Sequence, residues 1–404
     1  MIRYLTAGES HGEALIGIVE GLPAGIPVTT QEINHQLARR WLGYGRGGRS
    51  KFERDLVHIY SGVRFSRTMG SPIALRLDNA AYTKDRSGWP EVMSVSGTGE
   101  GIEKVTLPRP GHADLTGLQK YGFDDIRPVI DRASARETAM RVACCTLARQ
   151  LLRQVGIEIG SHVVRLGEVG MTDPNEWFDR VHELIRDGAE GLNAVADESA
   201  LRILDEDLTQ RCIAHIDETK KRGDSLGGMY EVVVTGVPPG LGSYVQWDRR
   251  LDGRLAQAVL SIQAQKAVEI GDGVAGAGRP GSRVHDEITS AAAGFSRRTN
   301  HAGGIEGGMS NGMPIIVRGY MKPIPTLIKP LDSVDLASGE PQPTRYERSD
   351  VTSVPAASTV AEATVALVVA NAFLEKFGGD SLAEIRARHE AEVEKAREPA
   401  EHDR

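Results

Sequence analysis

The feature that most constrains the fold of this chain is an internal repeat. Four short glycine-containing segments recur, in the same order, in the second half of the sequence. The pairs are Gly8–Gly12 with Gly223–Gly227, Val19–Gly25 with Val234–Gly240, Gly45–Gly48 with Gly278–Gly281, and Gly70–Ile73 with Gly312–Ile315. The first two pairs share an offset of 215 positions, and the later pairs need only small insertions. Chance similarity is the alternative, but repetition in order predicts two structurally similar halves.

A long apolar segment closes each copy of the repeat and predicts a buried helix of about 20 residues. The first helix is expected from about Ser134 to Val155, and the second from about Ser358 to Phe377, each before a glycine that stops it. A third helix is predicted at Leu255–Ile270. Alternating apolar and polar residues predict strands. These are Ala14–Leu22, Leu56–Val63, Ile73–Leu77, Tyr230–Val237 and Pro314–Tyr320.

These elements predict an α+β fold in which two similar halves form one pseudo-symmetric domain over residues 1–380. The halves are expected at about 1–156 and 220–378. Residues 160–220 are rich in Asp and Glu, so we expect a polar connection with short helices near Trp177–Arg186 and Asp207–Lys221. The charged run at 381–404 has almost no apolar stripe, which predicts a solvent-facing helix or a tail.

Composition excludes several classes of protein. The mean hydropathy is −0.28 and no run of 18 apolar residues occurs, which argues against a transmembrane helix. The N-terminus lacks the apolar region of a secretory signal, and three cysteines, two of them adjacent, give no disulfide framework. A cytoplasmic location is therefore expected. No GxxxxGK[ST] segment occurs and no His or Cys pair has ligand spacing, so neither a nucleotide P-loop nor a metal site is predicted.

The repeat singles out His11 as a chemical residue. The second copy keeps the glycines of the first motif but has Leu226 in place of the histidine. The glycines therefore serve a shared turn, and that turn does not need a histidine. Ser10 recurs as Ser225, so a role for this serine in the turn itself is a real alternative to a chemical role.

Arginines gather in glycine- and proline-rich loops, although the formal net charge is −7. Arginine outnumbers lysine 37 to 11, and a bias of the genome towards GC can explain many of these residues. The gathered ones form four clusters, at Arg39–Lys51, Arg109–Asp114, Arg127–Thr138 and Arg345–Asp350. Glycine lets backbone N–H groups approach an anion, and arginine supplies a planar fork for its oxygens. Surface ion pairing explains any one cluster, but together they predict an anion site.

Nucleic-acid binding is the competing functional class, because Gly45-Arg-Gly-Gly-Arg49 looks like part of an RGG tract. Such binding needs a basic stripe interleaved with stacking aromatic residues. The chain has only 4 Trp, 9 Tyr and 7 Phe, its net charge is negative, and the motif occurs once. A non-catalytic anion- or RNA-binding protein is therefore the minor alternative.

Seven motifs in order resemble those of the chorismate synthase family, and they span residues 6 to about 380. They are Gly8-Glu-Ser-His-Gly12, Gly43-Tyr-Gly-Arg-Gly-Gly-Arg49, Arg109-Pro-Gly-His-Ala-Asp114, Arg132-Ala-Ser-Ala-Arg-Glu-Thr138, Asn300-His-Ala-Gly-Gly-Ile-Glu-Gly-Gly308, Met321-Lys-Pro-Ile-Pro-Thr326 and Arg348-Ser-Asp350. The resemblance implies a carbon–oxygen lyase of the shikimate pathway. The implied reaction is the anti 1,4-elimination of phosphate and a C6 hydrogen from 5-enolpyruvylshikimate 3-phosphate to give chorismate. It also implies reduced FMN as cofactor and a homotetramer with helices between antiparallel sheets.

The resemblance also assigns roles to residues. His11 is expected to donate a proton or hydrogen bond to the leaving phosphate, His112 to face the flavin, and Asp350 with Ser10 to relay the C6 proton. The residues expected around the substrate are Arg40, Arg46, Arg49, Arg109, Arg136 and Arg348. Those expected at FMN are Arg132, Ala133, Ser134, Gln263, Ala264, Gly307, Lys322, Pro323, Ile324, Pro325, Thr326 and Arg348. Gln263 stands where many members have Asn, and Lys322–Thr326 departs from the usual serine-rich form, which puts side-chain hydrogen bonds there in doubt.

The source of reduced flavin is a separate question. Some members of the family reduce their own flavin with NADPH, and Arg40 and Arg46 are sometimes linked to that nicotinamide. The sequence has no GxGxxG after a strand and no added reductase segment. We therefore expect a monofunctional enzyme that uses NADPH only indirectly, through an external flavin reductase.

Overall fold

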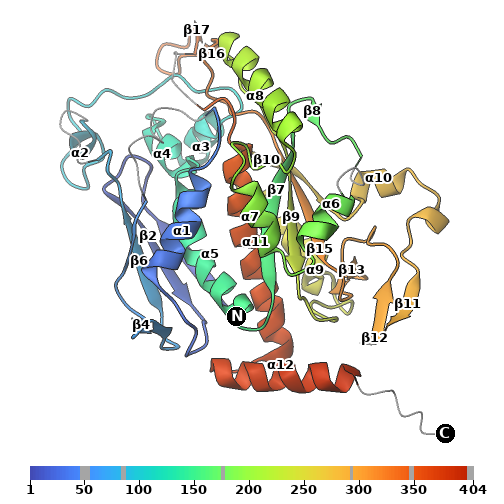
Figure 1. Cartoon of the computed structure of the whole chain (residues 1–404). Coiled ribbons are helices and arrows are strands. Elements are labelled where there is room, and N and C mark those ends of the chain that lie inside the picture. The colour runs from blue at the N-terminus through green and yellow to red at the C-terminus, as the bar shows by residue number, and fades with distance from the viewer. Residues whose placement is uncertain (46–54, 83–87, 174–177, 292–293, 345–349, 398–404) are drawn as a thin grey trace, which may run out of the picture.

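Two antiparallel sheets form outer layers, and long helices fill the space between them (Figure 1). The computed structural model describes residues 1–45, 55–82, 88–173, 178–291, 294–344 and 350–397. The first sheet has the order β1-β2-β6-β3 and the second β10-β15-β9-β7-β8. Their strands are β1 (Arg3–Ala7), β2 (Ala14–Glu20), β3 (Val57–Ile59), β6 (Ile73–Asp78), β7 (Glu158–Leu166), β8 (Val169–Gly170), β9 (Gly228–Thr235), β10 (Gln265–Ile270) and β15 (Ile315–Met321).

Strand register reproduces the sequence repeat residue by residue. In the first sheet Val19 of β2 pairs with Ile73 of β6, and in the second Val234 of β9 pairs with Ile315 of β15. These are the positions that the repeat aligns with each other. The turn glycines agree as well, since Gly8 and Gly223 both have positive φ, +103° and +73°. A Cβ on Gly8 would lie 2.4 Å from the carbonyl oxygen of Ala14, so only glycine fits there. The predicted duplicated α+β fold is confirmed.

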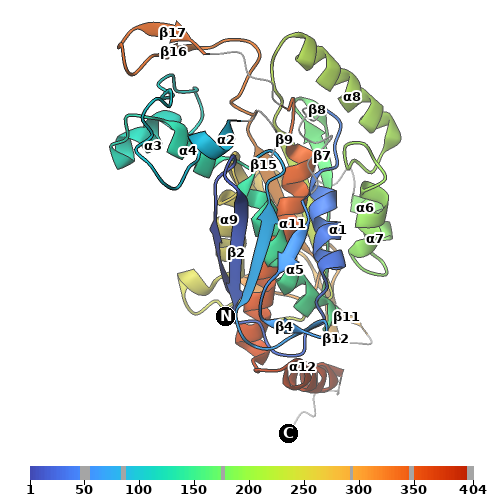
Figure 2. The ribbon, with the colours of Figure 1, turned by 90° about the vertical axis from the view of Figure 1, so that its left-hand side faces the viewer.

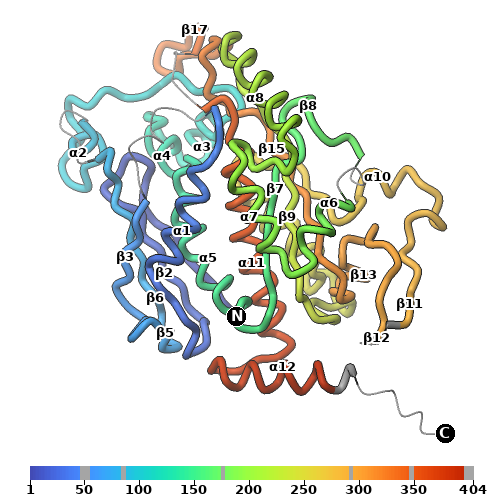
Figure 3. Tube along the Cα trace, in the orientation of Figure 1, coloured from blue at the N-terminus to red at the C-terminus, as the bar shows by residue number. Residues whose placement is uncertain are grey.

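The order of the strands bears on where the second half begins. β1 lies beside β2 and β7 lies beside β9, so β7 is the counterpart of β1. We propose that the second half begins at β7 rather than near residue 220. The segment predicted as a polar connection over 160–220 starts with this buried strand, because each half needs a fourth strand. What remains, 167–227, is an insertion that carries α6 (Phe178–Leu184), α7 (Glu190–Ala196) and α8 (Glu206–Lys221), traced in Figure 3.

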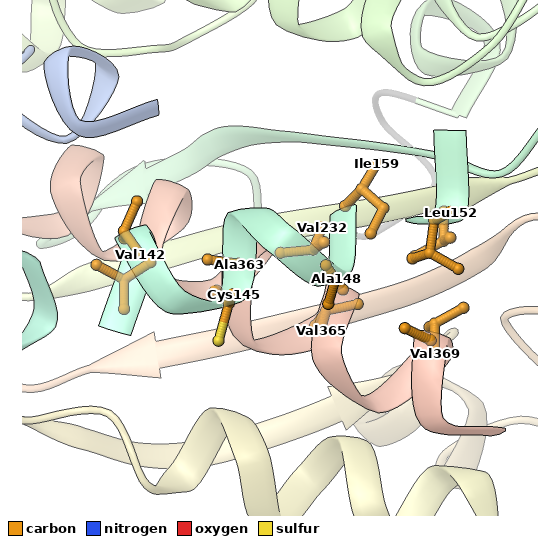
Figure 4. Packing of buried hydrophobic residues seen from close by; sticks show 14 of the residues in the cluster. Val142, Cys145, Ala148, Leu152, Ile159, Val232, Ala363, Val365 and Val369 are labelled. Carbon is orange, nitrogen blue, oxygen red and sulfur yellow. The ribbon is translucent and has the colours of Figure 1, made fainter. Parts of the chain in front are cut away.

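Four helices lie between the sheets and form the core. They are α1 (Thr30–Arg40), α5 (Glu137–Arg153), α9 (Leu251–Leu260) and α11 (Val354–Phe377). Figure 4 shows Leu152 of α5 beside Val369 of α11. Burying each such side chain contributes roughly 1.5–3 kcal/mol. The two long helices confirm the predicted apolar segments within a few residues.

The third predicted helix is only half right. α9 ends at Leu260, and Ala264 has a φ of +66°, which a continuing helix does not allow. Gln265–Ile270 then forms β10 and pairs with β15. Without this segment, the backbone N–H and C=O groups of β15 would be unpaired at the edge of the sheet. Pairing with them favours a strand over the helix that the periodicity of the segment predicts. Similarly, the strand predicted over Leu56–Val63 is divided into β3 and the start of β4, because a turn lies between them.

The remaining elements are short or peripheral. α11 is the one described helix long and apolar enough to cross a membrane, but 78% of its apolar stretch is buried, as expected for a core helix. The charged C-terminal run forms α12 (Leu382–Arg397), at the opposite end from the β16–β17 hairpin (Figure 2). The short elements are β4 (Val63–Arg64), β5 (Arg67–Thr68), α2 (Trp89–Val92), α3 (Asp114–Tyr121), α4 (Arg127–Ala133), α10 (Gly273–Ala277), β11 (Ile288–Ala291), β12 (Gly294–Arg297), β13 (Ile305–Glu306), β14 (Met309–Ser310), β16 (Asp332–Val334) and β17 (Pro341–Pro343).

A buried carboxylate ties the central helices together. Glu362 of α11 is 1% exposed and accepts hydrogen bonds from both terminal nitrogens of Arg39, each at 2.8 Å. Arg149 of α5 donates at 2.6 Å and Arg202 at 3.2 Å. Burial alone would raise the pKa of Glu362, but these guanidinium groups lower it well below its usual range. The ionised carboxylate of Glu362 stabilises the fold fully at pH values above the usual pKa of a carboxylate. This stabilisation is lost as the pH falls towards the lowered pKa of Glu362.

Glu362→Gln is expected to lower the free energy of unfolding by about 3–5 kcal/mol, because it removes the one carboxylate charge that three buried guanidinium groups share. Urea unfolding of the purified protein measures this change. Glu375→Gln is the matched control on the same helix, since its partner Arg254 lies near the surface and such a pair contributes about 1 kcal/mol or less. Equal effects of the two substitutions would contradict the central role of Glu362.

Candidate active site

A cavity of about 1130 Å³ lies at the end of the sandwich away from α12. Loops from both halves line it. They are the β1–β2 loop, the segments around α2, α3 and α4, the α9–β10 turn, the segment after β15, and the residues just before α11. Cationic and titratable side chains gather here, namely His11, Arg109, His112, Arg127, Lys322 and Asp350.

The β1–β2 loop presents Ser10 and His11 to the cavity. The side-chain amide of Asn79 donates to the carbonyl oxygens of Ser10 and Gly12, both at 2.9 Å, and so fixes the loop from beneath. His11 Nδ1 lies 2.5 Å from a carboxylate oxygen of Asp131, and its ring stacks on Trp89 with centroids 3.8 Å apart. The hydroxyl of Ser134 donates to that of Ser10 at 3.1 Å. Both residues are therefore held by several contacts.

A second histidine on the cavity wall is held by a charge network. Asp114 is fully buried and hydrogen-bonds to Nδ1 of His112. It also accepts from the backbone N–H of Arg109 at 3.0 Å and from the Nε of Arg109 at 2.9 Å. Burial would raise the pKa of Asp114, but the hydrogen bonds from His112 and Arg109 lower it to about 2. Arg109 also donates to the hydroxyl of Thr326 at 3.0 Å, across the cavity wall.

Two helix N-termini converge beside this cavity. A neighbouring pocket of about 210 Å³ shares Ser10, Ser134 and Asp350 with it and is lined by the first turns of α5 and α11. The positive end of the helix dipole at each N-terminus favours an anion. Arg40 and Arg136 line the same pocket. Their guanidinium groups are placed by the buried Asp55, with Arg136 at 2.6 Å and Arg40 at 3.9 Å.

Segments of the second half form the other wall. Lys322 donates its backbone N–H to the carbonyl oxygen of Ala264 at 3.0 Å and its ammonium to that of Gly111 at 2.8 Å. Desolvation lowers the pKa of Lys322, with a smaller contribution from Lys266. The hydroxyl of Ser225 donates to the carbonyl oxygen of Ile324 at 2.7 Å. The second copy of the glycine motif thus holds the cavity wall, whereas the first copy contributes His11.

Comparison with known proteins identifies the family. A sequence model described as chorismate synthase matches residues 2–374. A curated chorismate synthase of Salinibacter ruber is 69% identical over 97% of this chain and 98% of its own, and one of Chlorobaculum tepidum is 55% identical over 96% and 97%. A crystal structure of a chorismate synthase superposes with a TM-score of 0.78 at 42% identity, covering 98% of both chains.

The chain belongs to the chorismate synthase family. The family assignment makes it an enzyme, a carbon–oxygen lyase of aromatic amino-acid biosynthesis, as the sequence predicted.

The cavity brings together most residues that the family resemblance predicts. All four residues expected to be catalytic, Ser10, His11, His112 and Asp350, line it. So do Arg109 and the expected flavin residues Ala133, Ser134, Gln263, Ala264, Lys322, Ile324, Pro325 and Thr326. Arg40 and Arg136 line the adjoining pocket. Arg46, Arg49 and Arg348 lie outside the described residues.

Three residues expected at the flavin do not line this cavity. Pro323 belongs to the segment that forms the wall without itself lining it. Arg132 donates to the carbonyl oxygen and hydroxyl of Thr6, both at 3.0 Å, and lines a separate surface pocket beyond Gln263. Gly307 lies at the exposed turn between β13 and β14. Chain position alone does not show which side of a wall a residue faces.

Sequence reasoning missed residues that the structure places at the site. Asp131 is the one acidic residue among the three arginines of Arg127–Arg136, and this contrast was the available signal. Asp114 closes the Arg109–Asp114 motif without a role assigned to it. Asn79 and Trp89 lie outside every motif, so nothing local marks them. Their contacts with the His11 loop arise only when distant segments fold together.

Asn79→Ala is expected to lower the free energy of unfolding by about 2 kcal/mol, because it leaves two buried carbonyl oxygens without a donor. Turnover should fall as well, since the loop that carries His11 loses its support. Chemical unfolding and steady-state assays measure the two effects. Asn311→Ala, at a side chain that bonds Glu306 away from the cavity, should leave turnover unchanged. Full turnover in Asn79→Ala would contradict this role.

Proposed function

We propose that this chain converts 5-enolpyruvylshikimate 3-phosphate to chorismate in the described cavity, with reduced FMN bound beside the substrate. The observation that carries the proposal is that two histidines, each hydrogen-bonded to a buried aspartate, line one cavity together with Arg109, Arg127 and Lys322. The substrate bears a phosphate and two carboxylates. Several cations and two helix N-termini suit such a polyanion.

The cavity also fits a flavin. Its volume of about 1130 Å³ is slightly above the usual range for a pocket that holds one small ligand. Gln263 has a buried side-chain oxygen without a hydrogen-bond partner among the described residues, as expected for an atom that awaits a ligand. Backbone of the Lys322–Thr326 segment and Ala264, together with the hydroxyl of Ser134, would hold the cofactor. When bound there, reduced FMN would supply the electron density that weakens the bond to the leaving phosphate.

The protein residues bind the substrate and move protons. In the elimination, the bond between C3 and the phosphate oxygen breaks with its electron pair on the phosphate, and C6 loses its hydrogen. Nε2 of His11 would donate a proton or hydrogen bond to the departing phosphate. Asp350 and Ser10 would take part in removing the C6 proton. His112, held by Asp114, would support the charge of the flavin.

Assembly and location follow the family. We propose a homotetramer in the cytoplasm, with an external flavin reductase as the source of reduced FMN. The alternative, a non-catalytic anion- or RNA-binding protein, is disfavoured because the cationic side chains gather inside a cavity. A strand of RNA would need them along an open stripe.

The direct test is chorismate release. The purified protein is expected to form chorismate from 5-enolpyruvylshikimate 3-phosphate with dithionite-reduced FMN and not with oxidised FMN, under anaerobic conditions. Absorbance of chorismate and released inorganic phosphate are followed together. Absence of product with fully reduced FMN would overturn the proposed function and leave the non-catalytic alternative.

His11→Ala is expected to lower kcat about 100-fold or more, because a positioned proton donor contributes at least that much. Binding of FMN should remain within a few-fold of the native protein, since His11 is assigned to the phosphate. Stopped assays and a flavin-fluorescence titration separate the two readouts. Unchanged turnover would remove His11 from catalysis.

The proposed dependence on an external reductase gives a further expectation. Anaerobic mixing of the protein, FMN and NADPH should leave the flavin oxidised, as followed by its visible absorbance. A known flavin reductase added afterwards should bleach it and start chorismate formation. Rapid bleaching without the reductase would show that this chain reduces its own flavin.

A further inference from the structure

Asp131 is a buried carboxylate whose environment is unusual for its charge. Its side chain is fully shielded from solvent, on the short helix α4. One oxygen lies 2.5 Å from His11 Nδ1, and the other has no hydrogen-bond partner among the described residues. A buried ionised carboxylate is costly unless it is paired with an opposite charge. A protonated His11 supplies this opposite charge, because its imidazole ring is then cationic.

The second histidine of the cavity offers the contrast. Asp114 also bonds a histidine Nδ1, but Arg109 gives it two further hydrogen bonds within 3.0 Å. Its charge is therefore balanced whether or not His112 is protonated. Asp131 has no such arginine among its described hydrogen-bond partners, so His11 alone carries that role. The two aspartates look alike in position but differ in what they require of their histidine.

The ring of His11 is fixed in a second direction by Trp89. The two rings stack with an interplanar angle of 18°, and Arg127 lies over the Trp89 ring at 5.5 Å from its centroid. With Nδ1 on Asp131 and one face on Trp89, Nε2 is the ring nitrogen at the cavity that has no hydrogen-bond partner among the described residues. The other charged groups around this cavity are Arg109, His112, Lys322 and Asp350, and Glu9 and Glu13 flank His11 on its own loop.

We propose that Asp131 is a positioning residue that keeps His11 protonated, with Nε2–H directed into the cavity as the proton donor. Trp89 holds the plane of the ring. This role depends on the proposed function only in the experiment that measures turnover. In the donation step the Nε2–H bond breaks and an O–H bond forms on the phosphate. The imidazole is left neutral and still bonded to Asp131 through Nδ1.

Trp89 provides a probe that needs neither substrate nor flavin. An imidazolium in contact with an indole quenches its fluorescence more than neutral imidazole does, so a pH titration of the ligand-free protein reports the charge on His11. The difference between native protein and Trp89→Phe isolates this signal from the other tryptophans. His11→Gln should abolish the transition.

Asp131→Asn is expected to move the midpoint of this transition to lower pH by about one unit or more, as loss of an opposite charge at contact distance does. Asp114→Asn is the matched control and should leave the Trp89 transition in place. Asp131→Ser, a second neutral variant, gives the same test if the amide variant does not fold, as judged by circular dichroism. An unchanged midpoint in the folded neutral variant would overturn the proposal.

Turnover adds a second arm. In Asp131→Asn, kcat at neutral pH should fall about 100-fold with KM within a few-fold, and it should recover as pH is lowered through the shifted transition. Asp131→Glu should retain the native pH profile. A fall in kcat that is the same at every pH would show a merely structural role and overturn the proposal. If the native protein makes no chorismate, the proposed function fails, and the fluorescence arm still decides the role of Asp131.

Discussion

One buried carboxylate, Glu362, stabilises the core on which the site is built. It joins Arg39 of α1, Arg149 of α5 and Arg202 of the 167–227 insertion to α11. Burial lowers the pKa of Arg202 to about 9, which shows how strongly this environment disfavours charge. Glu362 is the carboxylate that all three guanidinium groups share, and Asp197 gives Arg39 a further hydrogen bond at 2.6 Å. Because the cluster fixes α5 relative to α11, it also fixes where their N-termini lie.

Those N-termini explain how a protein of net charge −7 holds a site for a polyanion. The first turns of α5 and α11 lie close together, beside the loops that carry His11, His112 and Lys322. Helix dipoles and short-range contacts decide the potential there, whereas distant surface charges are screened within about 10 Å. The overall charge thus says little about the cavity.

The duplication shows how one frame serves two purposes. In the first half the glycine turn presents His11 to the cavity. In the second half the same turn places Leu226 against the core, while Ser225 holds the cavity wall through the carbonyl oxygen of Ile324. The sequence argument that the histidine is dispensable for the turn agrees with this difference. Ser10 remains compatible with a role in the turn and with a chemical role. Its hydroxyl accepts a hydrogen bond from Ser134, and its backbone is hydrogen-bonded to Asn79 and Asp131.

The sequence by itself determined the duplicated fold, its two long helices and most residues of the cavity, because glycine turns, apolar periodicity and ordered motifs are local signals. It placed β10 in a helix and missed β7, since both strands depend on partners far along the chain. Only the tertiary structure brought Asp131 and Trp89 to His11 and Asn79 to the loop that carries it, and placed Arg132 and Gly307 outside the cavity lining. Which face a side chain presents, and what it meets there, is decided by packing between distant segments.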